Sequence, residues 1–294
     1  MKNYLNTNLI IESSYYKDDA YFSDIAEERV NGIKIERCVL KNSKPSFMGN
    51  FVDGHYVTIE LPELSEILPI QTEDTVTVLS NELRALVKSS CNKEINKALS
   101  VLIVGIGNRH ITPDSIGPLV VEKLSVTRHL AVLSKRVFDS IGSCKVCAIS
   151  CGVMGETGIE SLDIIKGVLS RIHVDVVVAV DALAARETRR LSRVVQLCDT
   201  GISPGAGVGN RRQTIDKAAL GVPIIAIGVP TVISAATMVA DAFMEAGIEA
   251  EEKITSSVLD NCKQLFVTPK NCDSISESVS AIIARGIDKT FCGI

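Results

Sequence analysis

Two aspartates follow apolar, strand-like runs in this chain, and paired carboxyl groups can perform acid–base chemistry. Asp114 comes shortly after Val101-Leu-Ile-Val-Gly105-Ile-Gly107, and Asp181 directly follows Val174-Asp-Val-Val-Val-Ala-Val180. In open α/β sheets, ligands bind beyond the carboxyl ends of the parallel strands. Two neighbouring carboxyl groups cannot both ionise cheaply, so one keeps a proton and acts as an acid while the other activates water. The sequence therefore predicts a catalytic pair at Asp114 and Asp181.

The alternative for each aspartate is a local structural role. Asp114 precedes Gly117-Pro118, where a helix is expected to begin, and could cap that helix. Asp181 could form a salt bridge at the rim of the sheet. The shared position of the two residues, each after an apolar run, favours the catalytic interpretation.

A glycine-rich segment at residues 205–212 supplies a second candidate site. Alternate glycines allow backbone N–H groups to approach a ligand closely, and two arginines follow them. Such a loop could bind an oxyanion or a substrate carboxylate. A flexible surface loop is an equally good interpretation. The residues predicted to bind substrate are Gly205, Gly207, Gly209, Asn210 and Arg211.

Two glycine motifs lack residues that their usual chemistry needs. Gly105-Ile-Gly107 has neither the third glycine nor the later acid of a dinucleotide site, so a tight turn is favoured. Gly201-Ile-Ser203-Pro-Gly205 matches a nucleophile elbow, but proline follows the serine and all four histidines precede it. Neither a nucleotide cofactor nor a serine hydrolase is therefore expected.

The nine cysteines show no metal signature. Cys144, Cys147 and Cys151 are closely spaced but lack a fourth nearby ligand, so packing in the core is favoured. We expect no metal and no cofactor. The chain is too long for a small disulfide scaffold and its start has no apolar signal region, which favours a reducing cytoplasm.

An open sheet would bring the two aspartates together, and the order of the expected strands and helices indicates such a sheet. Residues 1–29 are polar and form an N-terminal arm that is a candidate propeptide; residues 30–294 form a single α/β domain. Short strands are expected between residues 32 and 79. Strands and helices then alternate, which predicts a mostly parallel sheet with helices on both faces. The expected strands are 101–104, 145–149, 174–180, 193–197 and 222–228, and the expected helices are 81–98, 159–172, 233–246 and 274–284.

Composition excludes several functional classes. The net charge of −4 and the absence of basic blocks argue against direct nucleic-acid binding. The uncharged stretch 222–240 is interrupted by Pro223, Gly228 and Pro230, so it predicts a buried strand and turn, not a membrane span. No membrane association is expected.

Many short motifs follow one another from about Val101 onward, among them Thr112-Pro-Asp-Ser-Ile-Gly-Pro118, Asp181-Ala-Leu-Ala-Ala-Arg186, Gly207-Val-Gly-Asn210, Ala226-Ile-Gly-Val-Pro-Thr231 and Phe266-Val-Thr-Pro-Lys270. In these motifs the chain resembles the germination protease family of spore-forming bacteria. The resemblance implies an endopeptidase that degrades small acid-soluble spore proteins during germination. It also implies a homotetramer in the cytoplasm of the spore core and a fold related to hydrogenase-maturation endopeptidases. An atypical aspartic mechanism, with acids at the positions of Asp114 and Asp181, is implied as well.

The resemblance further implies a zymogen that trims its own N-terminus before Leu, Ile or Phe, after an acidic residue. Asn8-Leu9 aligns with the expected cut but has an amide in place of the acid, and Asp24-Ile25 is a second candidate. Ser203 stands where a family histidine is expected. Two alternatives stay open: a metal-dependent maturation-type endopeptidase that uses the same acids as ligands, and a catalytically silent protein that binds spore proteins.

Overall fold

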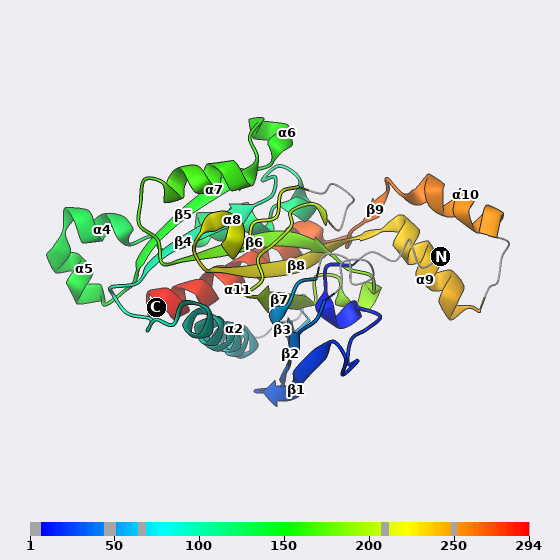
Figure 1. Ribbon diagram of the computed structural model, residues 1–294, viewed down its shortest axis with the longest axis horizontal. Coiled ribbons are helices and arrows are strands. Elements are labelled where there is room, and N and C mark those ends of the chain that lie inside the picture. The colour runs from blue at the N-terminus through cyan, green and yellow to red at the C-terminus, as the bar shows by residue number, and fades with distance from the viewer. Residues whose placement is uncertain (1–6, 44–50, 64–68, 207–211, 248–251, 294) are drawn as a thin grey trace.

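The computed structural model describes residues 7–43, 51–63, 69–206, 212–247 and 252–293. These residues form an α/β structure around one nine-stranded mixed sheet (Figure 1). The strand order is β1-β2-β3-β7-β8-β6-β4-β5, and β9 pairs with an extension of β8. The expected α/β class is thus confirmed, and the parallel and antiparallel pairs occupy different parts of the sheet.

The parallel part of the sheet contains the strands that the apolar runs predict. Its strands pair in the order β5, β4, β6 and β8. Their side chains are buried on both faces along most of β4, β6 and β8, which explains why these strands are continuous apolar runs rather than alternating ones. Their bounds are β4 Ser100–Ile106, β5 Lys145–Gly152, β6 Val176–Ala184 and β8 Ile224–Ser234.

The antiparallel part is formed by the first three strands together with β7 and β9. The expected short strands after residue 32 are therefore present, but the sheet as a whole is mixed and not mostly parallel. The direction of β7 could not be inferred from its sequence, because an apolar run predicts a buried strand and says nothing of its orientation. The bounds are β1 Phe22–Val30, β2 Ile33–Leu40, β3 Gly54–Glu60, β7 Val194–Cys198 and β9 Phe266–Val267.

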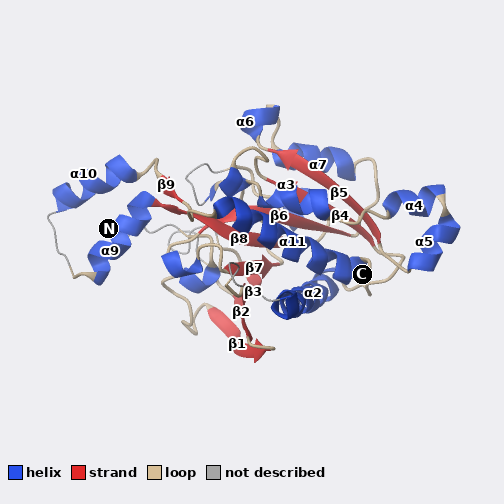
Figure 2. Ribbon diagram, turned by 180° about the vertical axis from the view of Figure 1, so that it is seen from behind, coloured by secondary structure: helices blue, strands red, loops and turns tan. Residues whose placement is uncertain are grey.

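Helices cover both faces of the sheet, and Figure 2 shows α2 and α11 against the face seen from behind. One face packs against α2 (Pro69–Cys91), α3 (Ile116–Lys123) and α11 (Cys272–Phe291). The other packs against α7 (Ser161–Leu169), α8 (Lys217–Leu220) and, near β7 and β8, the apolar residues 9–11. The hairpin of α4 (Arg128–Leu133) and α5 (Lys135–Ile141) lies at one end of the molecule, and α9 (Ala235–Glu245) and α10 (Glu252–Cys262) lie at the other.

Two expected elements differ from those observed. The helix expected at 81–98 is α2, which begins at Pro69 and ends at Cys91, where Asn92 adopts a left-handed φ of 50°. The expected boundary between arm and domain, after Arg29, falls inside β1. Most side chains of β1 are exposed on this edge strand, so its sequence carries no apolar alternation that would indicate a strand.

All nine cysteines are free thiols. Cys144 and Cys151 are buried in the apolar core, and Cys147 packs against it. None of the helices within the described ranges combines the length and apolar character of a membrane span.

Candidate active site

A tight turn at the end of β4 determines the position of Asp114. Gly107 has a φ of +117°, and a Cβ there would lie 2.0 Å from the main-chain oxygen of Asp114. Only glycine allows this approach. The chain can therefore fold the 3-10 turn η3 (Thr112–Asp114) back onto the strand end, where the Asn108 N–H donates to Asp114 Oδ2 at 2.7 Å.

A hydrogen bond from the neighbouring strand β8 holds the same turn. Thr231 is buried, and its Oγ1 donates to the carbonyl oxygen of Pro113 at 2.5 Å. Asp114 is thus held from two directions, by its own turn and by a strand on the far side of β6.

Asp181 lies on the central strand β6, in register with Gly228 of β8. The residue is buried, with 4% of its surface exposed, and its Oδ1 accepts the Ala182 N–H at 2.8 Å. Burial raises the pKa of Asp181 well above its usual value, and the nearby Asp114 carboxyl raises it further. Asp181 therefore tends to keep its proton.

Asp114 has the more polar surroundings of the two acids. Burial raises its pKa and the charge of Glu156 adds to this, while the hydrogen bond from Asn108 lowers it. Because Asp181 is more completely buried than Asp114, burial favours the protonated form of Asp181 more strongly.

Both acids line one cleft of about 470 Å³. Its walls are largely apolar and include Ile106, Ile111, Val153, Met154 and Phe266. The structure thus brings together the two aspartates that the sequence singles out. A cleft with apolar walls and a few convergent polar groups is typical of a ligand-binding site.

The glycine-rich loop is only partly described. Gly205 lines the cleft, whereas Gly207, Gly209, Asn210 and Arg211 lie outside the described residues. Arg212, at the end of the loop, also lines the cleft. Its Nη1 lies 3.1 Å from the Met154 sulfur and 3.8 Å from the Glu160 carboxylate.

The two candidate self-processing sites lie in different places. Asn8 lines the cleft together with the acids, and Leu9 next to it has no exposed surface. Asp24 and Ile25 lie on the edge strand β1, at an irregularity in its pairing with β2. Only the first site is thus brought to Asp114 and Asp181.

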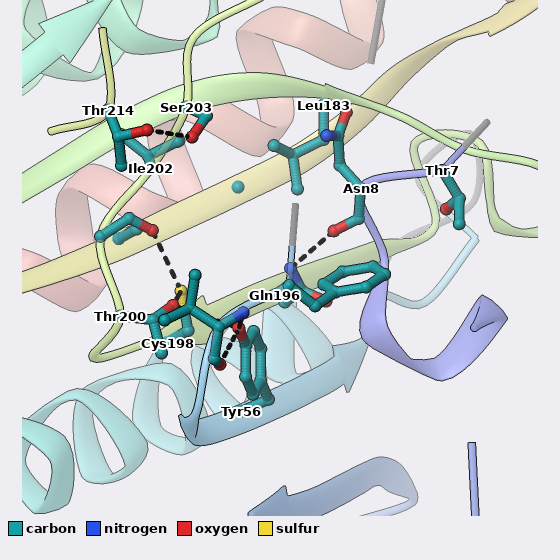
Figure 3. A pocket seen from close by; sticks show the side chains of 15 residues that line it. Thr7, Asn8, Tyr56, Leu183, Gln196, Cys198, Thr200, Ile202, Ser203 and Thr214 are labelled. Carbon is teal, nitrogen blue, oxygen red and sulfur yellow. Dashed lines mark hydrogen bonds between the residues drawn. The ribbon is translucent and has the colours of Figure 1, made fainter. Parts of the chain in front are cut away.

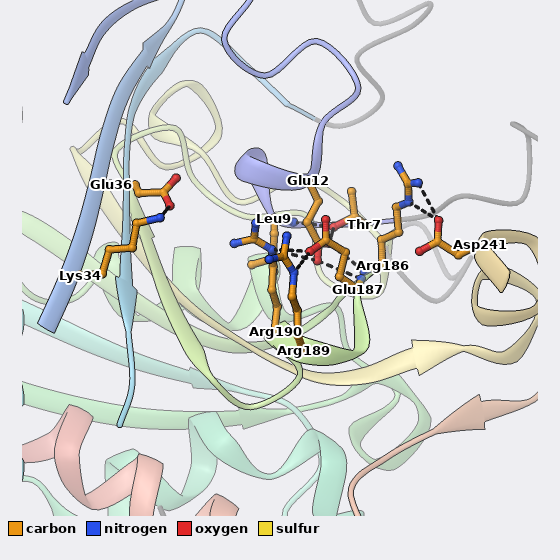
Figure 4. Close-up of polar contacts among 10 residues, drawn as sticks. All are labelled: Thr7, Leu9, Glu12, Lys34, Glu36, Arg186, Glu187, Arg189, Arg190 and Asp241. Atoms are coloured by element: carbon orange, nitrogen blue, oxygen red, sulfur yellow. Dashed lines mark hydrogen bonds and ion pairs between the residues drawn. The ribbon is translucent and has the colours of Figure 1, made fainter. Parts of the chain in front are cut away.

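The N-terminal strap, which we define as residues 7–12, is a feature that the sequence did not reveal. It ends in the 3-10 turn η2 (Ile10–Glu12), and the buried Glu12 carboxylate accepts the backbone N–H groups of Arg186 and Glu187 at 2.7 and 3.0 Å (Figure 4). Thr7 Oγ1 donates to the same carboxylate, and Arg190 Nε lies 3.7 Å from it. The apolar triplet Leu9-Ile10-Ile11 in an otherwise polar arm is the signal that could have indicated this docking.

Gln196 on β7 is a second residue that sequence analysis missed. Its side chain hydrogen-bonds the main chain of the strap at Ile10 and at Asn8, and Figure 3 shows the bond to Asn8. A polar residue within the apolar run Val194-Val-Gln-Leu-Cys198 was its only sequence signal. Within the described ranges, no cluster of three or more His, Cys, Asp or Glu side chains has the arrangement of a metal site.

Residues 12–246 match the family model described as "Germination protease". The chain belongs to the germination protease family. The germination protease of Clostridium tetani (strain Massachusetts / E88) is 38% identical over 287 residues, which cover 90% of this chain and 87% of the relative. That of Caldanaerobacter subterraneus subsp. tengcongensis is 39% identical over 310 residues, covering 97% and 93%. That of Bacillus subtilis (strain 168) is 44% identical over 218 residues, covering 74% and 58%.

Among solved structures, the [NiFe] hydrogenase maturation protease HycI from Thermococcus kodakarensis KOD1 is similar to this chain. The likeness covers 72% of this chain and 99% of HycI, with 19% identity and a TM-score of 0.36. A similarity of this size supports no conclusion about the active site.

Membership of the germination protease family makes the chain a peptidase. The matched residues extend from Glu12 to Ala246 and so include both aspartates, Gln196 and the Glu12 anchor of the strap. The C-terminal elements α10, β9 and α11 lie beyond the match.

Proposed function

We propose that this germination protease hydrolyses small acid-soluble spore proteins during spore germination, with Asp114 and Asp181 as its catalytic pair. The observation that carries the proposal is the meeting of the two carboxyl groups in one cleft, with unequal surroundings. Unequal surroundings separate the two pKa values, and one acid can then donate a proton while the other accepts one.

The mechanism assigns one role to each aspartate. The Asp114 carboxylate takes a proton from water, and the water oxygen attacks the scissile carbonyl carbon. Asp181 gives its proton to the carbonyl oxygen, forming a gem-diol. Asp114 then passes its proton to the amide nitrogen, Asp181 regains a proton from the gem-diol, and the C–N bond breaks. Water is consumed, and a carboxylic acid and an amine are released.

We propose the bond between Asn8 and Leu9 as the self-processing site of a zymogen. Support comes from the position of Asn8 in the cleft that holds both acids. The alternative cut after Asp24 lies in the edge strand β1 and would require that strand to leave the sheet. The 205–212 loop is proposed to bind the substrate, since Gly205 and Arg212 line the same cleft.

The proposed setting is the cytoplasm of the spore core, and the proposed assembly is a homotetramer. Support comes from the family membership alone.

The first experiment is mass spectrometry of a small acid-soluble spore protein incubated with the unmutated chain, with Asp114→Asn and with Asp181→Asn. We expect a discrete cut with the unmutated chain and a loss of rate of at least about 10²-fold in each variant, the usual contribution of acid–base catalysis. The solvent-exposed Asp163→Asn is the matched control.

Each other outcome contradicts a part of the proposal. A cut that survives both substitutions moves the chemistry elsewhere in the chain. Binding without any cut, even after removal of the arm, supports a silent binding protein. Loss of the cut on chelation, with metal in the purified protein, supports the metal-dependent alternative.

A further inference from the structure

The side chain of Gln196 forms two hydrogen bonds to main-chain atoms of the strap. Its Oε1 accepts the Ile10 N–H at 2.7 Å, and its Nε2 donates to the Asn8 carbonyl oxygen at 2.9 Å. The side-chain amide thus bonds a carbonyl and the N–H two residues later. Such a contact does not depend on the side chains of the bound peptide. A peptide that adds a strand to a sheet is likewise held by its main-chain hydrogen bonds.

Gln196 lies in the same row of the sheet as the proton-holding acid. Gly228 of β8 is in register with Asp181 on one side and with Gln196 on the other. In-register side chains point to one face of a sheet, and two strand spacings separate these backbones by about 10 Å. Asp181 and Gln196 therefore project from the same face.

The space between them cannot hold a side chain from the middle strand. A Cβ at Gly228 would lie 2.3 Å from Leu183 Cδ1. The Leu183 side chain therefore packs directly over this glycine, between Asp181 and Gln196. The strap passes beside Leu183, since Asn8 and Leu183 both line the cleft with the acids and also a smaller cavity of about 70 Å³ beside Gln196 (Figure 3).

A second main-chain contact fixes the direction of the strap. The Asn8 N–H donates to the Ala184 carbonyl oxygen at 2.9 Å, two residues beyond Ala182 on β6. Asn8 is thus held from β6 by its N–H and from β7 by its carbonyl. A peptide seated in this way has one residue bonded to β6 by its N–H and to β7 by its carbonyl.

We propose that Gln196 is a substrate-binding residue, which holds a peptide in the cleft by its main chain, and that residues 8–10 of the strap occupy the place of that peptide. The inference rests on the proposed function, because it takes the cleft with Asp114 and Asp181 as the place of peptide hydrolysis. The inference adds to the two acids a residue that recognises the peptide and that lies on β7, whereas Asp181 lies on β6.

The test measures the binding of a fluorescent peptide with the sequence Thr-Asn-Leu-Ile-Ile-Glu-Ser, that of residues 7–13. The full chain carries Glu12→Ala, to release its own strap, and Asp114→Asn, to prevent turnover. A second peptide has an ester oxygen in place of the N–H of its first isoleucine, the group that corresponds to the Ile10 donor. We expect the ester to bind about five- to tenfold more weakly, the loss of one buried hydrogen bond.

The decisive variant is Gln196→Met, which keeps the size of the side chain and removes both polar atoms. We expect the amide peptide to bind at least about tenfold more weakly to this variant, because both hydrogen bonds are lost. The ester should also weaken, because it loses the bond to its Asn carbonyl, but the difference between amide and ester should disappear. An ester penalty of the same size with Gln196 and with Met would overturn the proposal, as would unchanged binding of the amide peptide.

Two further variants separate the loss of the Gln196 hydrogen bonds from a general effect on folding. Thr58→Val changes a buried neighbour that is in register with Gln196 on β3, and it should leave the ester penalty intact. If Gln196→Met does not fold, Gln196→Glu retains the acceptor and loses the donor; it should keep the ester penalty while binding both peptides more weakly. Because the peptide is bound and not cut, absence of proteolysis would overturn the proposed function without affecting this result.

Discussion

Burial raises the pKa of Asp181 well above its usual value and also raises that of Asp114, but the surroundings of these two identical side chains differ. Asp181 is fully enclosed and has one backbone donor, at Ala182, whereas Asp114 lies on a turn at the cleft and accepts a bond from Asn108. The pair could be predicted from sequence because both residues directly follow or closely follow apolar strands. Which of them keeps the proton depends on burial, and that could not be predicted.

Replacing Asp181 by Asn should stabilise the protein at neutral pH. The pKa of Asp181 is raised in the folded state, so unfolding releases a proton once the pH exceeds the unfolded value near 3.9. The wild-type chain then loses stability as the pH rises towards the folded pKa, by about 1.4 kcal/mol per pH unit, and the variant does not. Urea unfolding at pH 4, 5.5 and 7 should show a stability gap that grows with pH.

The control for this titration is Asp163→Asn, a solvent-exposed change on α7. Its stability difference from the wild type should stay small at every pH. Parallel curves for Asp181→Asn and the wild type would mean that Asp181 is ionised in the folded protein, and the assignment of the shared proton would be wrong.

At the scale of the elements, the middle of the strap and its end at Glu12 are held in different ways. Gln196 bonds the middle, the apolar residues Leu9 and Ile10 are fully buried, and Glu12 anchors the end to the backbone after β6. Burial raises the pKa of Glu12, against the hydrogen bonds that lower it. The Glu12 side chain is the anchor of the strap, and its removal leaves the N–H groups of Arg186 and Glu187 without their acceptor.

Glu12→Ala should release the strap without unfolding the sheet. Leaving the Arg186 and Glu187 N–H groups unsatisfied costs on the order of 1–3 kcal/mol. Hydrogen exchange should become faster in residues 7–12 and stay unchanged in β4 and β6. Glu122→Ala, which removes an exposed partner of Arg109, is the control. Equal protection of the strap in both variants would show that Glu12 is not its anchor.

The elements that carry the acids were predictable, whereas β1 and the strap were not. β4 and β6 are apolar on both faces and stand out as uninterrupted runs. β1 is mostly exposed, and the strap owes its place to contacts with residues more than 170 positions away, such as the Asn8 contact with Ala184. Pairings over such separations leave no periodic signal in the local sequence.

At the scale of the molecule, exposed apolar side chains gather on the α4–α5 hairpin. Within the described residues, Leu133 and Val132 are the most exposed large apolar side chains, at 79% and 74%. Val137 and Ile141 of α5 are also exposed, and the hairpin lies at one end of the molecule (Figure 1). Contiguous apolar patches on a protein surface mark sites of association.

If the protein forms the proposed tetramer, Leu133→Glu should reduce its assembly, because a buried unpaired carboxylate disfavours an apolar interface. Sedimentation velocity at micromolar concentration should show a smaller species than the wild type. Met244→Glu, on α9 at the other end of the molecule, should leave the assembly unchanged. A wild-type monomer would rule out the tetramer, and an unchanged Leu133→Glu would place any interface elsewhere.

Because Leu9 is fully buried, the proposed cleavage between Asn8 and Leu9 should be a step that is not reversed by rebinding of the cut ends. A cut between Asn8 and Leu9 would create an ammonium group on a residue that has no contact with solvent. It would also create a carboxylate on Asn8, in the cleft that holds Asp114, the proposed carboxylate of the pair. A charge without water or a partner is strongly disfavoured, and like charges repel. Both new ends would therefore leave the cleft, and cleavage would act as a one-way switch that empties the site for the next chain.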